Sequence, residues 1–361
     1  MCMNSHMELL PGLPNDVAME CLIRVPFEKF SVVASVCKDW KSQIQLPEFQ
    51  QHRKAAGLAR SVIVLSQARA NPERNSCVGK LLSPPVYRLT LCEPETGRRS
   101  ELPPPAEFSD GLPMFCHLLV VGSELVVMGG CDPVTWQTSN MVYVYNFIAG
   151  EWRRGSDMPG PRRSFFGSAS GFDRTVYVAG GHDDEKNALK SVMMYDVAKD
   201  EWTHLPDMSK ERDECKAVFH RGKLHVIGGY PTSSQGRFKK DAEAFDPKTK
   251  RWDPAQEDFL DAATCPRTCI DGGDGKLYMC REGSVTVQNG ATWEVLGGLP
   301  DEVRNVAYVT AWQGQVLVIG SAMFGEPHRT YVMDLKNCTW TKLESPDEYS
   351  GHVQSGCWFE I

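Results

Sequence analysis

The chain contains 361 residues, of which 42% are hydrophobic and 24% charged, a composition typical of a globular protein that buries one large core or two smaller ones. Its net charge of −7 argues against a general nucleic-acid-binding protein, which needs a basic face to neutralise phosphates. No apolar run approaches the ~18–20 residues of a membrane helix, so we expect neither nucleic acid nor a membrane among its partners.

Thirteen cysteines are present, an odd number at irregular spacing, and the closest pair is Cys265 and Cys269. The N-terminal stretch MCMNSHMELL has no basic region followed by an apolar one, the pattern of a secretory signal. We therefore expect reduced, mostly buried thiols and a protein of the cytoplasm, the nucleus or both. Residues 1–6 are interpreted as an extension or a cloning remnant outside the folded part.

Helical periodicity covers the beginning of the chain. Apolar residues recur at three- and four-residue steps over 16–24, 27–36 and 38–44, and a further helical stretch covers 49–59. Pro26 ends the first helix, because proline disfavours helical backbone angles in the residue before it.

From SVIVLSQ (61–67) onwards the pattern is that of strands. We therefore divide the chain into a helical domain over 7–48, a helical linker over 49–60 and a β domain over 61–361.

A glycine–tryptophan pattern recurs through the β domain. Gly180-Gly181 ends an apolar run, Tyr195 ends the next, and Trp202 follows the tyrosine by seven residues. Two further copies are Gly129-Gly130, Tyr145 and Trp152, and Gly228-Gly229, Phe245 and Trp252. Trp293 and Trp340 continue the series after 41 and 47 residues. A period of ~40–50 residues with several short strands per unit indicates a β-propeller, and ~50 is the spacing of kelch repeats.

Each unit divides into four strands, which in the copy around Trp202 are 164–170, 175–181, 191–196 and 201–205. We expect the tyrosine and the tryptophan to pack between units. Degenerate copies bring the total to six units. The first of them lacks a preceding strand, and the C-terminal HVQSGCWFEI resembles a first strand with nothing after it. Pairing the two closes a ring of six blades and leaves no open edge.

The two faces of such a ring differ in their loops. Loops between strands 1 and 2 and between strands 3 and 4 share one face, and FIAG, VAKD, PKTK and LKNC are short. Loops after second strands lie on the other face, and they are long and varied, as in HDDEKNALK and YPTSSQGRFKKD. Long loops on a rigid scaffold usually carry binding, so we expect a target to be captured on this long-loop face.

The N-terminal segment LPGLPNDVAMECLIRVPFEKFSVVASVCKDWKSQI is similar to the F-box motif. The matching positions are Leu13-Pro14, Leu22, Val25-Pro26, Val36-Cys37, Trp40 and Ile44. The resemblance implies a small all-α F-box domain that binds the adaptor subunit of SCF ubiquitin ligases, and through it a cullin. Leu13, Pro14, Leu22 and Pro26 are the expected adaptor contacts, with packing inside the helical domain as the alternative.

The remaining residues resemble kelch repeats, and RRSELPPP, DPVTW, AGGHDDEKNA, ERDEC and HVIGGY resemble a plant subgroup of F-box/kelch-repeat proteins. The resemblance implies an all-β six-bladed kelch β-propeller, closed by its C-terminal strand. It also implies a substrate receptor whose target is degraded. Targets in that subgroup include phenylalanine ammonia-lyase and regulators of the cytokinin response.

An arginine recurs where blades begin their first strand, at Arg163, Arg212 and Arg304, with Arg267 in a less regular alignment. These side chains form a cationic ring that grips an acidic degradation signal, or they pair with acids such as Asp213 or Glu302 and hold the blades together.

His182 and the aromatic Trp136, Tyr230 and Phe324 lie in the long loops and are further candidates for target contact. For the aromatic residues, anchoring of the loops is the alternative. The run from His182 to Glu185 lacks the spacing of metal ligands, so a solvated loop is expected and no metal or cofactor.

Two other functions compete with a receptor. A propeller oxidase or lyase needs convergent His, Tyr, Cys or carboxylate groups on the long-loop face, and no such constellation is evident. A kelch interaction scaffold that no longer engages a ligase is the other possibility.

Overall fold

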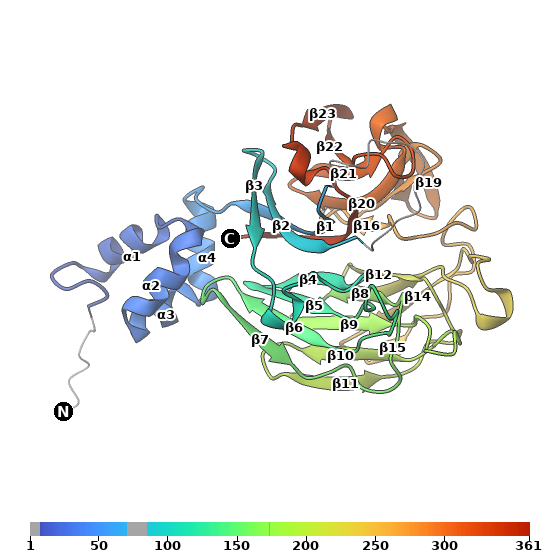
Figure 1. Ribbon diagram of the computed structural model, residues 1–361, viewed down its shortest axis with the longest axis horizontal. Helices are drawn as coiled ribbons and strands as arrows, with labels where there is room; N and C mark the ends of the chain where they lie inside the picture. Colours follow the sequence, from blue (N-terminus) through green and yellow to red (C-terminus); the bar gives the residue numbers. More distant parts are fainter. Residues whose placement is uncertain (1–7, 71–84, 173) are drawn as a thin grey trace.

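Figure 1 shows the computed structural model, which describes residues 8–70, 85–172 and 174–361. The proposed extension over 1–6 therefore lies outside the described residues. Helices gather at one end of the molecule, and strands form the body beside them (Figure 1). The helical part consists of α1 (Asn15–Ile23), the 3-10 turn η1 (Phe27–Lys29), α2 (Phe30–Val36), α3 (Lys38–Ile44) and α4 (Pro47–Ala55).

Local sequence explains where these helices begin and end. Cys37 is extended between α2 and α3, with φ −159° and ψ 163°, and its Sγ accepts a hydrogen bond from the Trp40 backbone N–H. Pro47 occupies the first turn of α4, where its missing N–H costs nothing, so this helix begins two residues before the predicted Phe49. The apolar face of the helices buries Leu22, Phe30 and Ile44 completely or nearly so.

Six four-stranded antiparallel sheets form the rest, as predicted. The first blade has the order β24-β1-β2-β3, and each later blade takes four consecutive strands, from β4–β7 to β20–β23. The strands of the first three blades are β1 (Ser61–Ala68), β2 (Tyr87–Glu93), β3 (Arg98–Leu102), β4 (His117–Val121), β5 (Glu124–Met128), β6 (Val142–Asn146), β7 (Glu151–Gly155), β8 (Gly167–Ser170), β9 (Thr175–Ala179), β10 (Val192–Asp196) and β11 (Glu201–Leu205).

The strands of the other three blades are β12 (Lys216–His220), β13 (Lys223–Ile227), β14 (Ala242–Asp246), β15 (Arg251–Trp252), β16 (Ile270–Asp271), β17 (Leu277–Arg281), β18 (Ser284–Asn289), β19 (Thr292–Gly298), β20 (Asn305–Trp312), β21 (Gln315–Ser321), β22 (Arg329–Asp334) and β23 (Thr339–Leu343), and β24 (Val353–Glu360) completes the first. Short 3-10 turns lie between strands at η3 (Ala106–Phe108), η4 (Thr232–Ser234), η5 (Asp301–Val303) and η6 (Asp347–Tyr349).

The C-terminal strand closes the ring. β24 pairs antiparallel with β1, from Ser61 opposite Glu360 to Gln67 opposite Val353, with one bulge near Ser66. The two ends of the β domain thus share a sheet, which confirms the predicted closure and removes the open edge that a first blade without its inner strand would have.

The recurring tryptophans join neighbouring blades, as predicted. In each case the indole Nε1 donates to a backbone carbonyl at the end of the outer strand of the preceding blade or after it, at 2.8 to 2.9 Å. The pairs are Trp152 with Pro103, Trp202 with Ser156, Trp252 with Pro206, Trp293 with Phe259, and Trp340 with Gly298. Tyr195 stacks on Trp202 with ring centroids 4.8 Å apart. The repeat therefore fixes the spacing between blades.

The inner strand of the third blade is shorter than expected. β8 begins at Gly167 and not at residue 164, because Phe165 takes a left-handed conformation with φ +53° and interrupts the extended run. Ser164 still pairs with His182 through an isolated bridge. Gly181, just before that bridge, has φ +82°, and a Cβ there would collide with the Ser164 carbonyl oxygen, so only glycine fits.

The helices pack on the short-loop face of blades 1 and 2. One apolar cluster runs from Phe30 and Phe49 in the helices to Phe147 and Ile148 in the loop after β6 and to Phe359 in β24. The buried Arg53 guanidinium on α4 donates to the carbonyls of Ile23, Val25 and Leu58. Because α4 shares the core of the other helices and of the propeller, the segment predicted as a linker is part of a continuous packed unit. The long loops lie on the opposite face.

Candidate functional site

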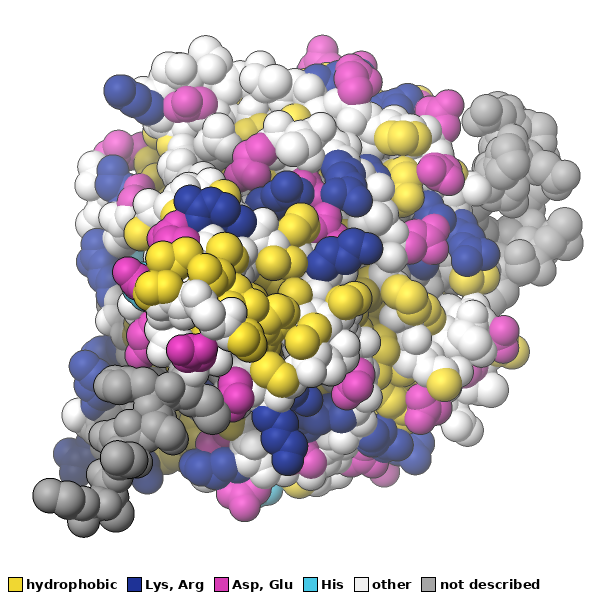
Figure 2. All heavy atoms as spheres, turned by 90° about the vertical axis from the view of Figure 1, so that its left-hand side faces the viewer, with side chains coloured by type: hydrophobic (Ala, Val, Ile, Leu, Met, Phe, Trp, Pro, Cys, Tyr) yellow, Lys and Arg dark blue, Asp and Glu magenta, His cyan; other side chains and the backbone are white. Residues whose placement is uncertain are grey.

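The helical end of the molecule exposes apolar side chains that the propeller does not cover. Figure 2 shows hydrophobic side chains gathered across the face that carries the helices. The exposed apolar residues of the helical part are Leu13, Val17, Val32, Val36 and Leu46, with exposed fractions of 38% to 59%. An exposed apolar patch of this kind usually marks an interaction site. We call these five residues the helical patch.

The predicted adaptor contacts divide between surface and core. Leu13, Pro14 and Pro26 are exposed, whereas Leu22 is 2% exposed and packs in the helical core, so its predicted role as a surface contact is wrong. Leu22 lies on the side of α1 that faces the other helices, next to the buried Ile23. The sequence reasoning missed Val32 and Val36. Their four-residue spacing on α2, offset from the buried Phe30 and Val33, is the signal that could have found them.

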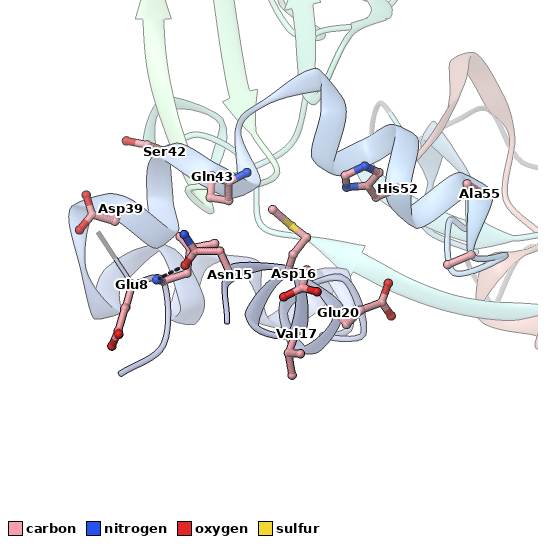
Figure 3. A pocket seen from close by; sticks show the side chains of 13 residues that line it. Glu8, Asn15, Asp16, Val17, Glu20, Asp39, Ser42, Gln43, His52 and Ala55 are labelled. Atoms are coloured by element: carbon pink, nitrogen blue, oxygen red, sulfur yellow. Dashed lines mark hydrogen bonds between the residues drawn. The ribbon is translucent and has the colours of Figure 1, made fainter. Parts of the chain in front are cut away.

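A groove of about 1160 Å³ lies beside α1. Figure 3 shows α1 on one side of it and residues of α3 and α4 on the other, with carboxylates of Glu8, Asp16, Glu20 and Asp39 around it. Its apolar lining includes Val17, which also belongs to the helical patch. The groove therefore continues the exposed apolar surface between helices and gives a partner helix or loop a place to insert.

Two of the four predicted ring arginines do not line an open surface. Arg163 and Arg212 are 1% and 2% exposed. Arg163 donates to the Gly180 carbonyl at 3.2 Å and to the Ser191 hydroxyl at 3.0 Å. Burial with no acidic partner lowers the pKa of Arg163 to about 10. This arginine holds the backbone of its own blade together, which is the alternative that the sequence left open.

Arg212 has the same place in the next blade but two acidic partners. Its Nη2 lies 2.6 Å from Asp241 Oδ2 and 3.0 Å from Glu243 Oε1. Burial opposes the charged form, yet the hydrogen bonds that Arg212 donates to Asp241 and Glu243 raise the pKa of Arg212. The predicted partner, Asp213, instead accepts from His182 Nδ1 at 2.9 Å. The prediction that Arg163 and Arg212 form part of a cationic ring is therefore wrong, because both guanidinium groups are buried and bind partners inside their own blades.

The other two arginines meet on the long-loop face. Arg267 and Arg304 line a pocket of about 200 Å³ together with Arg281, which the sequence reasoning missed. We call this pocket the blade-5 notch. Arg304 pairs with Asp301, three residues before it, and not with the expected Glu302, which binds Lys342 Nζ at 2.7 Å. Arg281 pairs with Asp261 through its two terminal guanidinium nitrogens, Nη1 and Nη2.

The loop from His182 to Glu185 is exposed to solvent at Asp184 and Glu185, as expected, but not at His182. Its side chain is buried, and its Nε2 lies 3.0 Å from Lys186 Nζ while Nδ1 contacts Asp213. Asp183 accepts backbone N–H bonds from Glu185 and Asn187 at 2.9 Å, which folds the loop onto itself. Because both ring nitrogens are engaged, His182 positions the loop and offers no free base. Within the described ranges, no group of three or more His, Cys, Asp or Glu could hold a metal ion.

The aromatic candidates also differ in their environment. Trp136 is 64% exposed and Phe324 98% exposed, so both are available for contact. Tyr230 is buried and donates to Glu214 Oε1 at 2.7 Å, which makes it a loop anchor. Phe115 and Phe165, not predicted, are partly exposed at the start of blades 2 and 3, with ring centroids 5.1 Å apart. Both have positive φ, a strained conformation that concentrates at functional sites.

Comparison with known proteins matches both parts of the chain. Residues 10–52 match the F-box domain, and residues 115–280 match the KLHDC2/KLHL20/DRC7 Kelch-repeats domain. The chain is 51% identical to F-box/kelch-repeat protein At1g15670 of Arabidopsis thaliana, over 98% of this chain and 100% of that protein. It is 49% identical to F-box/kelch-repeat protein At1g80440 of the same plant, with the same coverage. F-box/kelch-repeat protein SKIP20, also from Arabidopsis thaliana, is 37% identical over 76% of this chain and 73% of its own length. Across the described residues, no helix is both long and apolar enough to cross a membrane.

Proposed function

Because the chain belongs to the F-box/kelch-repeat family, we propose that it is the substrate-recognition subunit of an SCF-type ubiquitin ligase. The F-box binds the adaptor subunit, and through it a cullin, while the propeller holds a target protein for ubiquitination and proteasomal degradation. Catalysis belongs to other subunits of such a ligase, and membership of this family makes the chain a receptor and not an enzyme. The receptor acts by raising the effective concentration of the target near the ubiquitin donor.

The observation that supports the proposal is that an exposed apolar surface and the long loops lie on opposite faces of one packed unit. The helical patch lies on the short-loop side, where Phe147 and Phe359 tie the helices to the propeller. The long loops and the blade-5 notch lie on the other side. A receptor needs this separation, because adaptor and target must bind at the same time without competing.

We assign adaptor binding to the exposed members of the predicted set, Leu13, Pro14 and Pro26, together with Val32 and Val36. Their burial against a partner accounts for an apolar surface that the chain itself leaves open. The groove beside α1 extends this surface. The division into an F-box over 7–48, a linker over 49–60 and a propeller over 61–361 stays a prediction, and α4 (Pro47–Ala55) packs on both sides of its first boundary.

Target capture is assigned to the long-loop face, with Trp136, Phe324, Arg267 and Arg304 as its exposed members. Phenylalanine ammonia-lyase and regulators of the cytokinin response are the first targets to test, because DPVTW, AGGHDDEKNA and HVIGGY resemble the plant subgroup that recognises them. Such targets imply a receptor of the cytoplasm or the nucleus.

The adaptor assignment is tested with Val32→Glu/Val36→Glu in the full-length chain, mixed with purified adaptor. We expect the wild type to bind and the double variant to lose binding at least tenfold, because each glutamate places a charge in a buried apolar contact. Val295→Glu is the matched control, since Val295 is 67% exposed on the outer strand of blade 5. Equal adaptor binding by all three proteins would contradict the assignment. A wild type that binds no adaptor would favour a scaffold outside any ligase.

A further inference from the structure

The long-loop face is uneven at blade 5. Long loops follow the second strands of blades 2, 3 and 4, but only Glu282 and Gly283 join β17 to β18. This turn leaves the blade-5 notch, which is lined from three places: the segment before β16, the end of β17, and the segment before β20. With about 200 Å³, the notch has room for roughly six or seven water molecules. It can therefore take one or two side chains of a partner but not a folded element.

Most charged side chains in the lining of the notch are basic: Arg267, Arg281 and Arg304 against Glu282. Arg267 is exposed, and its Nη2 donates to the Val306 carbonyl at 2.6 Å. No ion pair to Arg267 exists among the residues that the structure describes. Among the described residues, the ion-pair partner of Arg304 is the neighbouring Asp301, and both side chains are largely exposed. Surface pairs of this kind contribute about 0–1 kcal/mol and exchange partners readily. Both arginines can thus receive a carboxylate from outside.

A further cation lies beside the notch. Lys216 begins β12, and burial lowers its pKa. Burial raises the pKa of the Cys265 thiol, which lines the notch, and the positive charges of Arg267 and Lys216 oppose this rise. Lys216 takes part in no ion pair within the described ranges of the chain. The acidic residues nearby are Asp261 and Asp301, which pair with Arg281 and Arg304, Glu282, which is exposed, and Glu214, which accepts from the Tyr230 hydroxyl.

We propose that the blade-5 notch binds the side-chain carboxylates of an acidic segment in the target protein, with Arg267 and Arg304 as the contacts. The proposal rests on the assignment of target capture to the long-loop face and names the chemistry that this face selects. Guanidinium groups bind carboxylates through two parallel N–H donors, which fixes orientation as well as charge. Arg281, whose Nη1 and Nη2 are both bound by Asp261, forms part of the wall of the notch and is not a contact.

Binding of a blocked peptide tests the proposal directly. The probe is a fluorescent hexaglutamate peptide with an acetylated N-terminus and an amidated C-terminus, titrated against the full-length protein in low salt. We expect saturable binding that weakens about tenfold in Arg267→Glu/Arg304→Glu, because two attractive contacts become repulsive. The double variant should in turn bind hexalysine, which shows that a folded notch has changed its preference.

The matched control is Arg221→Glu/Arg154→Glu. Arg221 donates to a backbone carbonyl, that of Gly275, as Arg267 does to Val306. Arg154 pairs with an aspartate three residues away, Asp157, as Arg304 does with Asp301. This control alters charge equally but on other surfaces, so we expect it to retain wild-type binding of hexaglutamate.

Four results would overturn the proposal: no hexaglutamate binding at millimolar peptide, equal binding by both double variants, equal binding of hexaglutamine, or binding only of a peptide with a free C-terminal carboxylate. Adaptor binding is measured on the same samples. If the notch variant keeps the adaptor and also binds hexaglutamate normally, the notch assignment fails while the receptor function stands. If the wild type binds no adaptor, the receptor function itself fails.

Discussion

Arg212 and Arg163 occupy equivalent positions in adjacent blades and allow the effect of a buried ion pair to be measured by difference. Arg212→Ala leaves Asp241 and Glu243 buried without their guanidinium partner. Removing one member of a buried pair typically costs about 3–5 kcal/mol. Arg163→Ala leaves only neutral acceptors on Gly180 and Ser191, for which about 1–3 kcal/mol is typical.

The expected difference between the two variants is therefore about 2 kcal/mol in the free energy of unfolding. For a domain of this size class, 1 kcal/mol shifts the melting temperature by about 2–4 °C. Arg212→Ala should thus melt about 4–8 °C below Arg163→Ala at pH 7, in a thermal unfolding experiment followed by circular dichroism. Lys210 Nζ lies 3.1 Å from Asp241 Oδ2 and still pairs with this carboxylate when Arg212 is removed. We therefore expect the difference in melting temperature to lie near the lower end of the range.

The pH dependence adds an independent check. Burial opposes ionisation of Asp241, but hydrogen bonding to Arg212 holds its pKa below the ordinary value. In the wild type this pair therefore contributes stability at pH values above about 3.9, the pKa of an unfolded aspartate, and loses it as the pH falls further. In Arg212→Ala, burial without the guanidinium raises the pKa of Asp241, so the variant loses stability as the pH rises toward 7. The difference in stability between the wild type and Arg212→Ala should therefore be smaller at pH 5 than at pH 7. Two results together would refute this reasoning: equal melting temperatures of the two alanine variants at pH 7, and a difference between the wild type and Arg212→Ala that does not change with pH.

Three further predictions concern closure, blade spacing and the two roles of the F-box leucines. Deletion of residues 351–361 removes β24 and opens the first blade, so gel filtration should show unfolded or aggregated protein, whereas unchanged melting would contradict closure. Trp202→Phe loses the indole bond to Ser156 and should destabilise by about 1 kcal/mol in chemical denaturation, with no change expected if that bond were dispensable. Leu22→Ala should cost about 2–5 kcal/mol of stability, because the side chain is buried. Leu13→Ala should melt as the wild type does and weaken adaptor binding. A destabilised Leu13→Ala beside a stable Leu22→Ala with weak adaptor binding would contradict these two roles.

The sequence predicted the architecture because each blade repeats the same local requirements. Tryptophans equivalent to Trp202 recur because each donates a hydrogen bond to the preceding blade, and Tyr195 stacks on Trp202. The first blade lacks an inner strand of its own, so the C-terminal strand had to supply it. The periodicity of the F-box likewise located four helices, with only their ends displaced by turns such as the one at Pro47.

The candidate site was harder to predict, because its residues depend on contacts across the fold. Arg212 is buried by Asp241 and Glu243, 29 and 31 residues further along, and nothing in its local sequence distinguishes it from the exposed Arg304. His182 is likewise fixed by Asp213 of the next blade. The blade-5 notch arises because the turn between β17 and β18 is too short to cover the surface beside it. The sequence reasoning looked for long loops and therefore missed a site that a short turn leaves open.

One measurement tests the central claim that opposite faces of this chain bind the ligase and the target. Tagged full-length protein, Val32→Glu/Val36→Glu and Val295→Glu are expressed in plant cells, and the adaptor, the captured proteins and their turnover are quantified after purification. The two-surface account predicts that the double variant loses the adaptor while capturing more of the same target, whose degradation slows, and that Val295→Glu behaves as the wild type. Loss of adaptor and target together in a stably folded double variant would contradict it.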